Sequence, residues 1–489
     1  MGEGAGKLNR IVPAPVPAPD GGPASLPVGR LGLLVRAALA PDEEARTAWM
    51  AWRAVADLDV APWNEVRMLG VIAGRIASLE PDAEIRPRVA GFRRKIWTHN
   101  HIRLRELQPM VARLVEAGIP LLLIKGSGRL TLDPSVAGER FVGDADALVP
   151  PDRQAEAIGL LESAGFTMGH QPWQQAAQGK GPISAHHAWS YRKGHSEVDL
   201  HHFAIPLNRL RGDDDGLWRS ARRITWRGLE LRVPGPEHAL LIAVVHGLRV
   251  AEGDSHGDWT VDACRLLDAE PLDWDLIVAE ARDRLLQAIL HAGLKYLAGE
   301  LRRPVPRQVL ARLAADRDAE LEAELGDYST SVIATTEPAV RRGFAMAMRR
   351  FARGAALPQP TEVAQTPFVS STVELLPEAN SFWVQLAGGL PPDWFVLRVG
   401  LELPVAELRG ESLLRILLPG LPVGSVRLVP PAGTGPLWRA TFHVPFHGGF
   451  LAARAIDRVG VLLLRDGQPL LWPGRRTVRV DLLAARVGG

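Results

Sequence analysis

The sequence predicts an α+β protein built from several successive regions, and three observations support that prediction. Apolar residues recur at helical spacing over residues 30–118 and again over 236–355. Between these stretches, short apolar runs alternate with helical segments, and from residue 368 on, short β-type runs follow one another between Gly and Pro turns. At 489 residues the chain exceeds what one hydrophobic core usually serves, so we expect two or three domains.

Composition and charge argue against several classes of protein. Hydrophobic residues make up 46% of the chain and charged residues 23%, which is a globular rather than a disordered profile. The formal net charge of +2 does not indicate a general polyanion binder, so a nucleic-acid partner, though possible, would need a local basic patch. No apolar run approaches the roughly 18 residues of a membrane span, and no secretory h-region opens the chain. We therefore expect a cytoplasmic protein with no membrane partner.

The first part of the chain combines a low-complexity tail with helices. Residues 1–29 are rich in Pro, Ala and Gly and predict a disordered tail. Within the helical region 30–118, residues 86–117 predict one long helix that Gly118 ends. The single cysteine, Cys264, lies in a later apolar helical pattern, which favours a buried structural thiol and excludes an intrachain disulfide.

The pattern changes abruptly after Gly118. Residues 119–124 form a short, largely apolar run that is typical of a strand buried on both faces. A Lys-Gly-Ser-Gly turn follows, and then a short helix to Leu132. The same kinds of pattern predict further elements: a strand at 141–149, a helix at 151–165, and a hairpin of two strands at 187–192 and 196–203.

Two aspartates on the predicted strand 141–149 are candidate catalytic residues. Asp144 and Asp146 stand two residues apart, so on a strand both carboxylates project from one face. Such a pair is costly when buried unless a cation lies between the charges, and Mg²⁺ prefers hard oxygen ligands. Asp199 supplies a third carboxylate on a later strand, which could hold a second ion or deprotonate an attacking hydroxyl. For the Asp-x-Asp pair alone, a solvated strand edge is the alternative.

The turn at residues 125–128 is a candidate phosphate site. Glycine lets the backbone come close to a phosphate, and the exposed N–H groups of a helix start favour anions. Ser127 could cap the helix or donate a hydrogen bond to a phosphate oxygen. A simple tight turn capped by serine is the alternative, and the residue order of a Walker loop is absent.

Three segments together resemble the uncharacterised bacterial nucleotidyltransferase family of the DNA polymerase β superfamily. They read Leu-Ile-Lys-Gly at 123–126, Arg-Phe-Val-Gly-Asp-Ala-Asp-Ala-Leu-Val at 140–149, and Val-Asp-Leu-His at 198–201. The likeness covers about residues 95–270, where His246 and a Trp-Thr-Val-Asp helix at 259–262 also look like the family. Residues beyond 368 resemble no family that we recognise.

The resemblance implies a fold, a reaction and a set of site residues. The fold is a small mixed β-sheet core flanked by helices, with a helical extension. The reaction uses Mg²⁺ or Mn²⁺ and moves a nucleoside monophosphate from a nucleoside triphosphate to a hydroxyl acceptor, releasing pyrophosphate. The acceptor, whether protein, RNA or small molecule, is left open. The implied roles are metal binding for Asp144, Asp146 and Asp199, and nucleotide binding for Lys125, Gly126, Ser127, Arg140 and His201. For Arg140, an ion pair with Asp144 or Asp146 is the alternative.

These patterns divide the chain into six regions: a tail at 1–29, a helical region at 30–118, a nucleotidyltransferase core at 119–235, a helical domain at 236–355, a proline-marked linker at 356–367, and a β-rich, antiparallel sandwich-like domain at 368–489. Two other functions stay open beside the transferase. One is a non-catalytic nucleotide-binding scaffold or sensor. The other is a carbohydrate- or protein-binding module acting through the β-rich domain, whose tryptophans could stack on sugars or fill its core.

For four further features we favour a structural explanation over a functional one. Five histidines could bind zinc, but their spacing fits no structural zinc pattern: His186, His187, His195, His201 and His202. His246 is expected to be a satisfied core histidine. The acidic stretch with Asp258 and Asp262 favours a solvated loop with a helix cap over a metal site. The arginine-rich segment 340–354 favours a solvated helix face over phosphate binding.

Overall fold

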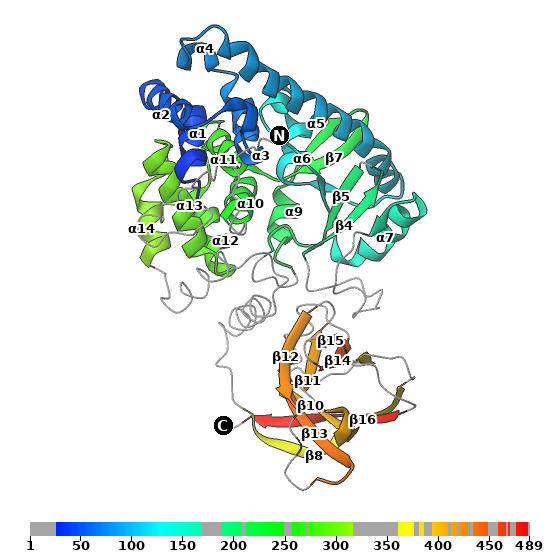
Figure 1. The fold of residues 1–489 in the computed structure, drawn as a ribbon. Helices are drawn as coiled ribbons and strands as arrows, with labels where there is room; N and C mark the ends of the chain where they lie inside the picture. The colour runs from blue at the N-terminus through cyan, green and yellow to red at the C-terminus, as the bar shows by residue number, and fades with distance from the viewer. Residues whose placement is uncertain are drawn as a thin grey trace, which may run out of the picture.

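The computed structural model describes residues 26–168, 187–194, 196–206, 212–248, 257–269, 271–315, 360–375, 381–385, 394–408, 412–418, 421–428, 430, 434–447, 458–465, 468–469 and 476–487. The first 25 residues of the expected tail, the arginine-rich segment 340–354, His186 and His195 lie outside these ranges. The protein is α+β, as predicted: helices surround one mixed sheet, and antiparallel sheets follow in the C-terminal part (Figure 1). None of the described helices combines the length and apolar character that a membrane crossing needs.

Helices form the N-terminal part, as their periodicity predicts. They are α1 (Gly29–Leu39), α2 (Asp42–Val55), α3 (Trp63–Ile72), α4 (Ile76–Leu79) and α5 (Ile85–Glu116), with a short 3-10 helix η2 (Leu58–Val60). Trp49 and Trp52 are fully buried and stack on each other, with ring centroids 5.4 Å apart. The long helix predicted at 86–117 is therefore confirmed as α5. Gly118 follows it with a φ of +66°, a left-handed conformation that glycine adopts without steric cost.

The central sheet is mixed and has the strand order β3-β4-β5-β2-β1-β7-β6. Its strands are β1 (Leu122–Leu123), β2 (Ala145–Leu148), β3 (Thr167–Met168), β4 (Ala188–Lys193), β5 (Ser196–His201), β6 (Arg222–Trp226) and β7 (Leu229–Val233). The hairpin predicted around Gly194 is confirmed, because β4 and β5 pair antiparallel. The hairpin of β6 and β7 was not predicted, and β7 joins the sheet through a parallel pairing with β1.

Two predicted strands are shorter than expected. β1 covers two of the residues in 119–124, and β2 begins at Ala145 rather than at 141. Side chains of α5 hold the backbone before β2 in place of a neighbouring strand: Val142 N donates to Asn100 Oδ1 at 3.0 Å, and Asn100 Nδ2 donates to the Arg140 carbonyl at 2.6 Å. Asp144 therefore lies on the loop that leads directly into β2.

The sheet separates two hydrophobic cores, which confirms that β1 is buried on both faces. Leu122 packs into a core shared by α1–α4 and the helices after residue 236, whereas Leu123 packs into a core shared with α5 and α7. The remaining helices of this part are α6 (Lys125–Leu132), η3 (Pro134–Gly138), η4 (Pro151–Arg153), α7 (Gln154–Ser163), α9 (Asp215–Ser220), α10 (Pro236–Leu248), α11 (Asp258–Ala269), α12 (Trp274–Asp283), α13 (Gln287–Glu300) and α14 (Arg307–Ala315). Cys264 of α11 is buried, as predicted, and burial raises the pKa of its thiol to about 11.

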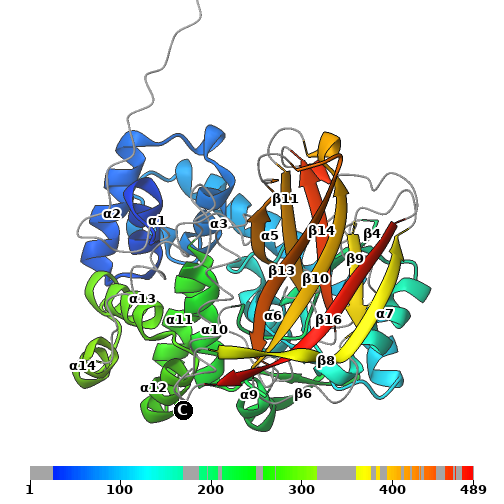
Figure 2. The ribbon, with the colours of Figure 1, turned by 90° about the horizontal axis from the view of Figure 1, so that it is seen from below.

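The C-terminal part is built of antiparallel sheets, as predicted (Figure 2). Its elements are β8 (Pro360–Leu375), β9 (Ser381–Gln385), β10 (Trp394–Pro404), η5 (Val405–Glu407), β11 (Ser412–Leu418), β12 (Leu421–Arg427), β13 (Leu437–His447), β14 (Arg458–Arg465), β15 (Gln468–Pro469) and β16 (Arg476–Val487). One sheet has the order β13-β10-β16-β8, and the other has β12-β11-β14-β15 with β9 beside β14. β8 begins at Pro360, inside the predicted linker, so the proline-rich stretch is partly strand.

Candidate active site

The parallel pairing of β2 with β5 brings the predicted acidic residues together. Asp146 of β2 stands opposite Asp199 of β5 in the register of the sheet, although 53 residues separate them in the chain. Asp144 immediately precedes β2, and His201 lies two residues after Asp199 on β5. Asp146, Asp199 and His201 each offer a ligand atom, and these atoms all lie within 4.8 Å of one another. The expectation that the strand of Asp199 lies beside that of Asp146 is confirmed.

Asp146 is the buried centre of this cluster, with 3% of its surface exposed. Lys125 Nζ donates a hydrogen bond to Asp146 Oδ1 at 2.5 Å, and His201 Nε2 lies 3.0 Å from the same oxygen. Burial alone would raise the pKa of this carboxyl, but the charge of Lys125 and the His201 hydrogen bond together hold it far below its ordinary value. Asp146 is therefore ionised at neutral pH.

The pKa of Asp144 is shifted in the opposite direction, above its ordinary value. The neighbouring Asp146 carboxylate, burial and the charge of Asp199 raise the pKa of Asp144 to about 7, although Lys125 opposes them. The raised pKa shows that the negative charge of this cluster exceeds what the protein's own cations neutralise. A set of carboxylate oxygens with such an excess fits a divalent cation, and magnesium and manganese both take this type of ligand.

Lys125 lies at the junction between β1 and α6, with a backbone φ of +50° that is unusual for a non-glycine residue. Burial would lower the pKa of its ammonium group, but the charges of Asp146, Asp144 and Asp199 raise it. The ammonium group thus stays protonated beside the acidic cluster. A non-glycine residue in this conformation costs on the order of 1–3 kcal/mol and persists where its surroundings require it.

Ser127 has a different place from the one predicted. Its side chain is fully buried in α6, whose N-cap is Ile124 and has no side-chain cap. Ser127 Oγ donates to the Ile124 carbonyl at 2.8 Å and accepts from Asp146 N at 3.1 Å. The prediction that Ser127 caps the helix is therefore wrong, and its contact with the triphosphate stays a prediction. The hydroxyl joins α6 to β2 and positions Asp146.

The two glycines of this turn are explained by close packing. A Cβ on Gly126 would lie 2.8 Å from Val142 Cγ2 and 3.3 Å from the guanidinium carbon of Arg140. A Cβ on Gly128 would overlap the carbonyl oxygen of Leu123, so that α6 could not approach β1. Gly126 thus presents bare backbone beside the Arg140 guanidinium at the start of a helix, an arrangement that suits an anionic group.

Arg140 forms its ion pairs with aspartates of α11 and not with Asp144 or Asp146. Its Nε lies 2.9 Å from Asp262 Oδ2, and its Nη1 lies 3.6 Å from Asp258 Oδ2. The alternative of an ion pair between Arg140 and Asp144 or Asp146 is thus wrong. Arg67 of α3 also pairs with Asp258. Two arginines and two aspartates therefore form one ionic cluster that joins α3 and α11 to the loop before β2.

Asp258 and Asp262 are not the solvated residues that we expected. They are 3% and 8% exposed, because the first turns of α11 pack against Arg67 and Arg140. Burial raises the pKa of Asp262, and Arg140 opposes that effect. Arg67 was missed altogether. An arginine next to Met68 and Leu69, both fully buried, was the available signal.

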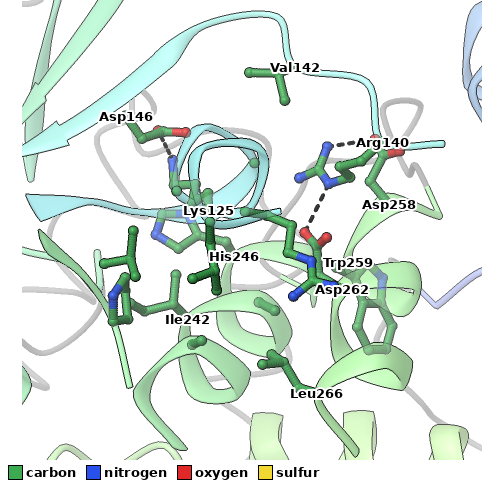
Figure 3. A pocket seen from close by; sticks show the side chains of 18 of the residues that line it. Lys125, Arg140, Val142, Asp146, Ile242, His246, Asp258, Trp259, Asp262 and Leu266 are labelled. Atoms are coloured by element: carbon green, nitrogen blue, oxygen red, sulfur yellow. Dashed lines mark hydrogen bonds and ion pairs between the residues drawn. The ribbon is translucent and has the colours of Figure 1, made fainter. Parts of the chain in front are cut away.

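A pocket of about 440 Å³ opens beside these residues (Figure 3). One side of its lining is polar and includes Lys125, Arg140, Asp144 and Asp146. The other side is largely apolar and is formed by the end of β7 with α10 and α11: Val233, Pro234, Pro236, Ala239, Ile242, Ala243 and Leu266. The pocket thus offers a charged end and an apolar end within one enclosure.

The histidines do not form a zinc site among the residues that the structure describes. The His201 ring lies 5.1 Å from that of His187 and 6.2 Å from that of His246, measured between centroids. His202 is turned away, and its Nδ1 lies 2.8 Å from Gln154 Nε2. His246 Nε2 donates to the Ala204 carbonyl at 2.9 Å, which agrees with a satisfied histidine, and the residue also lines the pocket. His201 is fully buried and bonded to Asp146, so it supports that carboxylate, and its predicted role in nucleotide binding stays a prediction.

Comparisons with known proteins found one matching family model and two similar solved structures. A family model described as an uncharacterised nucleotidyltransferase matches residues 57–301, half of the chain, and includes every residue of the site. No curated protein matches the chain. One similar solved structure is that of the antibiotic-resistance factor ANT(2'')-Ia, with 16% identity, a TM-score of 0.28, and coverage of 38% of this chain and 94% of that one. Another is an antigenic nucleotidyltransferase-like protein from Paracoccidioides brasiliensis, with 14% identity, a TM-score of 0.26, and coverage of 44% and 94%.

Proposed function

The chain belongs to the uncharacterised nucleotidyltransferase family, and from that membership we propose that it transfers a nucleoside monophosphate from a nucleoside triphosphate to a hydroxyl acceptor. The observation that carries this proposal is the pairing of Asp146 with Asp199 across β2 and β5, with Asp144 at the entrance to β2. Two carboxylates on neighbouring strands and a third at the entrance to β2, beside a pocket lined by Lys125 and Arg140, suit phosphoryl chemistry.

Asp144, Asp146 and Asp199 would hold the divalent cations, Mg²⁺ or Mn²⁺. When bound, such ions lower the pKa of an attacking hydroxyl and stabilise the charge that develops on the departing pyrophosphate. The excess negative charge that raises the pKa of Asp144 supports this assignment, because a bound cation would remove it. His201 and Lys125 keep Asp146 ionised for that role.

The cationic side chains at the pocket would bind the triphosphate. Arg140 lies against Gly126, where its guanidinium can donate a charge-assisted hydrogen bond to a phosphate oxygen. Asp262 accepts from Arg140 Nε and the Phe141 carbonyl accepts from Nη1, which leaves Nη2 beside Gly126 for the phosphates. Lys125 would contribute a point charge between Asp146 and the phosphates. The apolar end of the pocket suits the nucleobase, which needs contact area more than hydrogen bonds there.

In the transfer itself, the acceptor oxygen forms a bond to the α-phosphorus while the bond from that phosphorus to the bridging oxygen of the β-phosphate breaks. Pyrophosphate leaves with the electron pair of the broken bond. We assign the proton of the acceptor hydroxyl to Asp199, because this carboxylate is the more accessible of the two that pair across the strands. Ser190 Oγ donates to Asp199 Oδ1 at 2.6 Å, which orients the carboxylate and leaves Oδ2 as the proton acceptor.

Calorimetry with each nucleoside triphosphate, with and without Mg²⁺, tests the proposal. The wild type should bind at least one triphosphate in a magnesium-dependent manner, and Asp144→Asn/Asp146→Asn should lose that dependence. Asp152→Asn, which removes an exposed carboxylate beyond β2, is the matched control. The absence of magnesium-dependent binding in the wild type would refute the assignment. Binding without pyrophosphate release across protein, nucleic-acid and small-molecule acceptors would favour the non-catalytic sensor instead.

A further inference from the structure

Helix α5 carries a concentration of positive charge that the balanced net charge of the chain conceals. From Ile85 to residue 105 the sequence contains no Asp or Glu. The same stretch contains seven basic side chains: Arg86, Arg88, Arg93, Arg94, Lys95, Arg103 and Arg105. Most of its large apolar residues, such as Ile96 and Leu104, are buried, and Trp97 and Ile102 are the exceptions at 49% and 53% exposed. The helix therefore shows solvent a largely basic face.

One stripe of that face alternates cations with a flat ring. Arg94, Trp97, His101 and Arg105 follow at spacings of three, four and four residues, so they lie on one side of the helix. Trp97 is 49% exposed, and its ring stacks on that of His101 with centroids 3.9 Å apart. A tryptophan left this exposed is unusual unless it contacts a partner. We call these four residues the α5 stripe.

A second aromatic group connects α5 to the pocket. Trp63 of α3 is 42% exposed, lies edge-on to Phe141 with centroids 4.9 Å apart, and has Lys95 Nζ 5.4 Å from its ring centre. His99 of α5 also stacks on Phe141, with centroids 4.5 Å apart. Phe141 itself lines the pocket, three residues before Asp144. Phe141 thus links Trp63 and His99 to the pocket that Asp144 also lines.

Acidic residues near this surface already have basic partners. Glu139 pairs with Arg93 at 2.8 Å, and Asp59 pairs with Arg88. Glu106 accepts from Ser196 and lies 3.8 Å from Arg103. Within the described ranges, neither Arg94 nor Arg105 forms an ion pair, and both are exposed. These two side chains therefore keep their full charge for an external anion.

We propose that the α5 stripe and Trp63 bind single-stranded nucleic acid, and that the 3′ hydroxyl of this strand is the acceptor of the transfer. The inference rests on the proposed function and names the substrate class of the same site. Bases of a single strand stack on exposed rings while its phosphates contact neighbouring cations, which is the pattern found here. A duplex keeps the faces of its bases stacked on one another, and an acidic peptide has no bases that could stack on these rings. A lipid surface would require a continuous apolar side, and beside Trp97 the only large apolar side chain that α5 exposes among the described residues is Ile102.

The same bonds form and break in this reaction as in the proposed transfer, and the acceptor is now the 3′ hydroxyl of the strand. The 3′ oxygen of the strand bonds to the α-phosphorus of the nucleoside triphosphate, the bond to the β-phosphate bridging oxygen breaks, and pyrophosphate departs. The hydroxyl proton passes to Asp199. The product is a strand that is longer by one nucleotide and again ends in a 3′ hydroxyl.

Fluorescence anisotropy tests the binding surface with 5′-labelled strands of about 12 nucleotides, within the usual site size of such proteins. RNA and DNA of one sequence, their duplexes, and polyglutamate as a competitor are measured over a series of salt concentrations. Trp97→Ala should weaken single-strand binding by between about fivefold and a hundredfold. Arg94→Ala/Arg105→Ala should reduce the slope of log K against log salt by about 1.4, which is about 0.7 for each charge removed.

The matched control is Arg219→Ala/Arg307→Ala, which removes two exposed arginines from α9 and α14. It should bind single strands like the wild type. Equal loss in the control and the α5 variants would overturn the proposal, as would competition by polyglutamate as strong as that by unlabelled strand. Tighter binding of duplex than of single strand would also overturn it.

An extension assay then separates this inference from the proposed function. Wild-type protein with Mg²⁺ and triphosphates should lengthen the labelled strand, and Asp144→Asn/Asp146→Asn should bind the strand without lengthening it. Magnesium-dependent triphosphate binding without strand binding would refute the acceptor while leaving the proposed function intact. A strand that binds but is never lengthened, when the protein transfers the nucleoside monophosphate to another acceptor and releases pyrophosphate, would refute it equally. Loss of triphosphate binding itself would refute the proposed function.

Discussion

The raised pKa of Asp144 predicts that the metal-free protein becomes less stable as the pH rises. A carboxyl whose pKa is 3.8 in the unfolded chain and about 7 in the folded protein favours folding most strongly below the lower value. That contribution is lost as the pH rises through 7. The full shift corresponds to about 4 kcal/mol, of which about 2 kcal/mol falls between pH 5.5 and pH 8, and solvent screening of this half-buried group reduces both figures.

Divalent cations should reverse the trend. They bind the ionised carboxylate, so the stabilisation they provide should grow over the same pH range in which the metal-free protein weakens. Urea unfolding at about pH 5.5 and about pH 8, in EDTA and in excess Mg²⁺, measures both effects. The difference between wild type and Asp144→Asn isolates this group from the histidines, which titrate in the same range.

Asp144→Asn should flatten the pH dependence in EDTA and abolish the magnesium response at high pH. Asp152→Asn, with its exposed carboxylate, should leave both unchanged. If the free energy of unfolding of Asp144→Asn changes with pH as steeply as that of the wild type, the charge argument at this cluster is wrong.

Three further predictions concern positions around the site. Asp262→Asn should raise the KM for the nucleoside triphosphate about tenfold or more with a smaller change in kcat, because Arg140 loses the charged partner of its Nε. An unchanged KM in steady-state kinetics would contradict this prediction. Gly128→Ala should lower the free energy of unfolding by about 2–3 kcal/mol, because the new Cβ would overlap a β1 carbonyl. Gly159→Ala on α7 places its Cβ in open space and should raise the free energy of unfolding by up to about 1 kcal/mol. Equal changes for the two variants in urea unfolding would refute the packing argument. Cys264 should resist thiol reagents in the folded protein and react on unfolding, because it is buried and its pKa is raised; rapid labelling of the native protein would show otherwise.

Local sequence patterns predicted the structure correctly where it depends on one helix, strand or turn alone. The helical spacing of apolar residues located α5, and Gly118 marked its end. The turn at Gly194 located the hairpin of β4 and β5. Alternation along β5 placed Asp199 and His201 on one face. These predictions depend on the period of the backbone, which the sequence displays directly.

Contacts between distant segments decided the roles of individual side chains. Arg140 meets Asp262 across 122 residues, and no spacing rule connects the two. Ser127 looked like a helix cap until the position of β2 showed that its hydroxyl holds Asp146. The short pairing of β1 with β7 likewise depends on a hairpin that its polar composition did not reveal.

By itself, then, the sequence determined the fold class, the order of helices and strands in most of the described chain, and the three candidate carboxylates. These follow from hydrophobic periodicity, turn residues and the chemistry of neighbouring acids. The tertiary structure alone decided which charges pair, which polar groups are buried, and that Phe141 connects the pocket to Trp63 and to His99 of α5. Those properties depend on how separate elements pack, because burial and Coulomb energy are set by distances in space that local patterns do not encode.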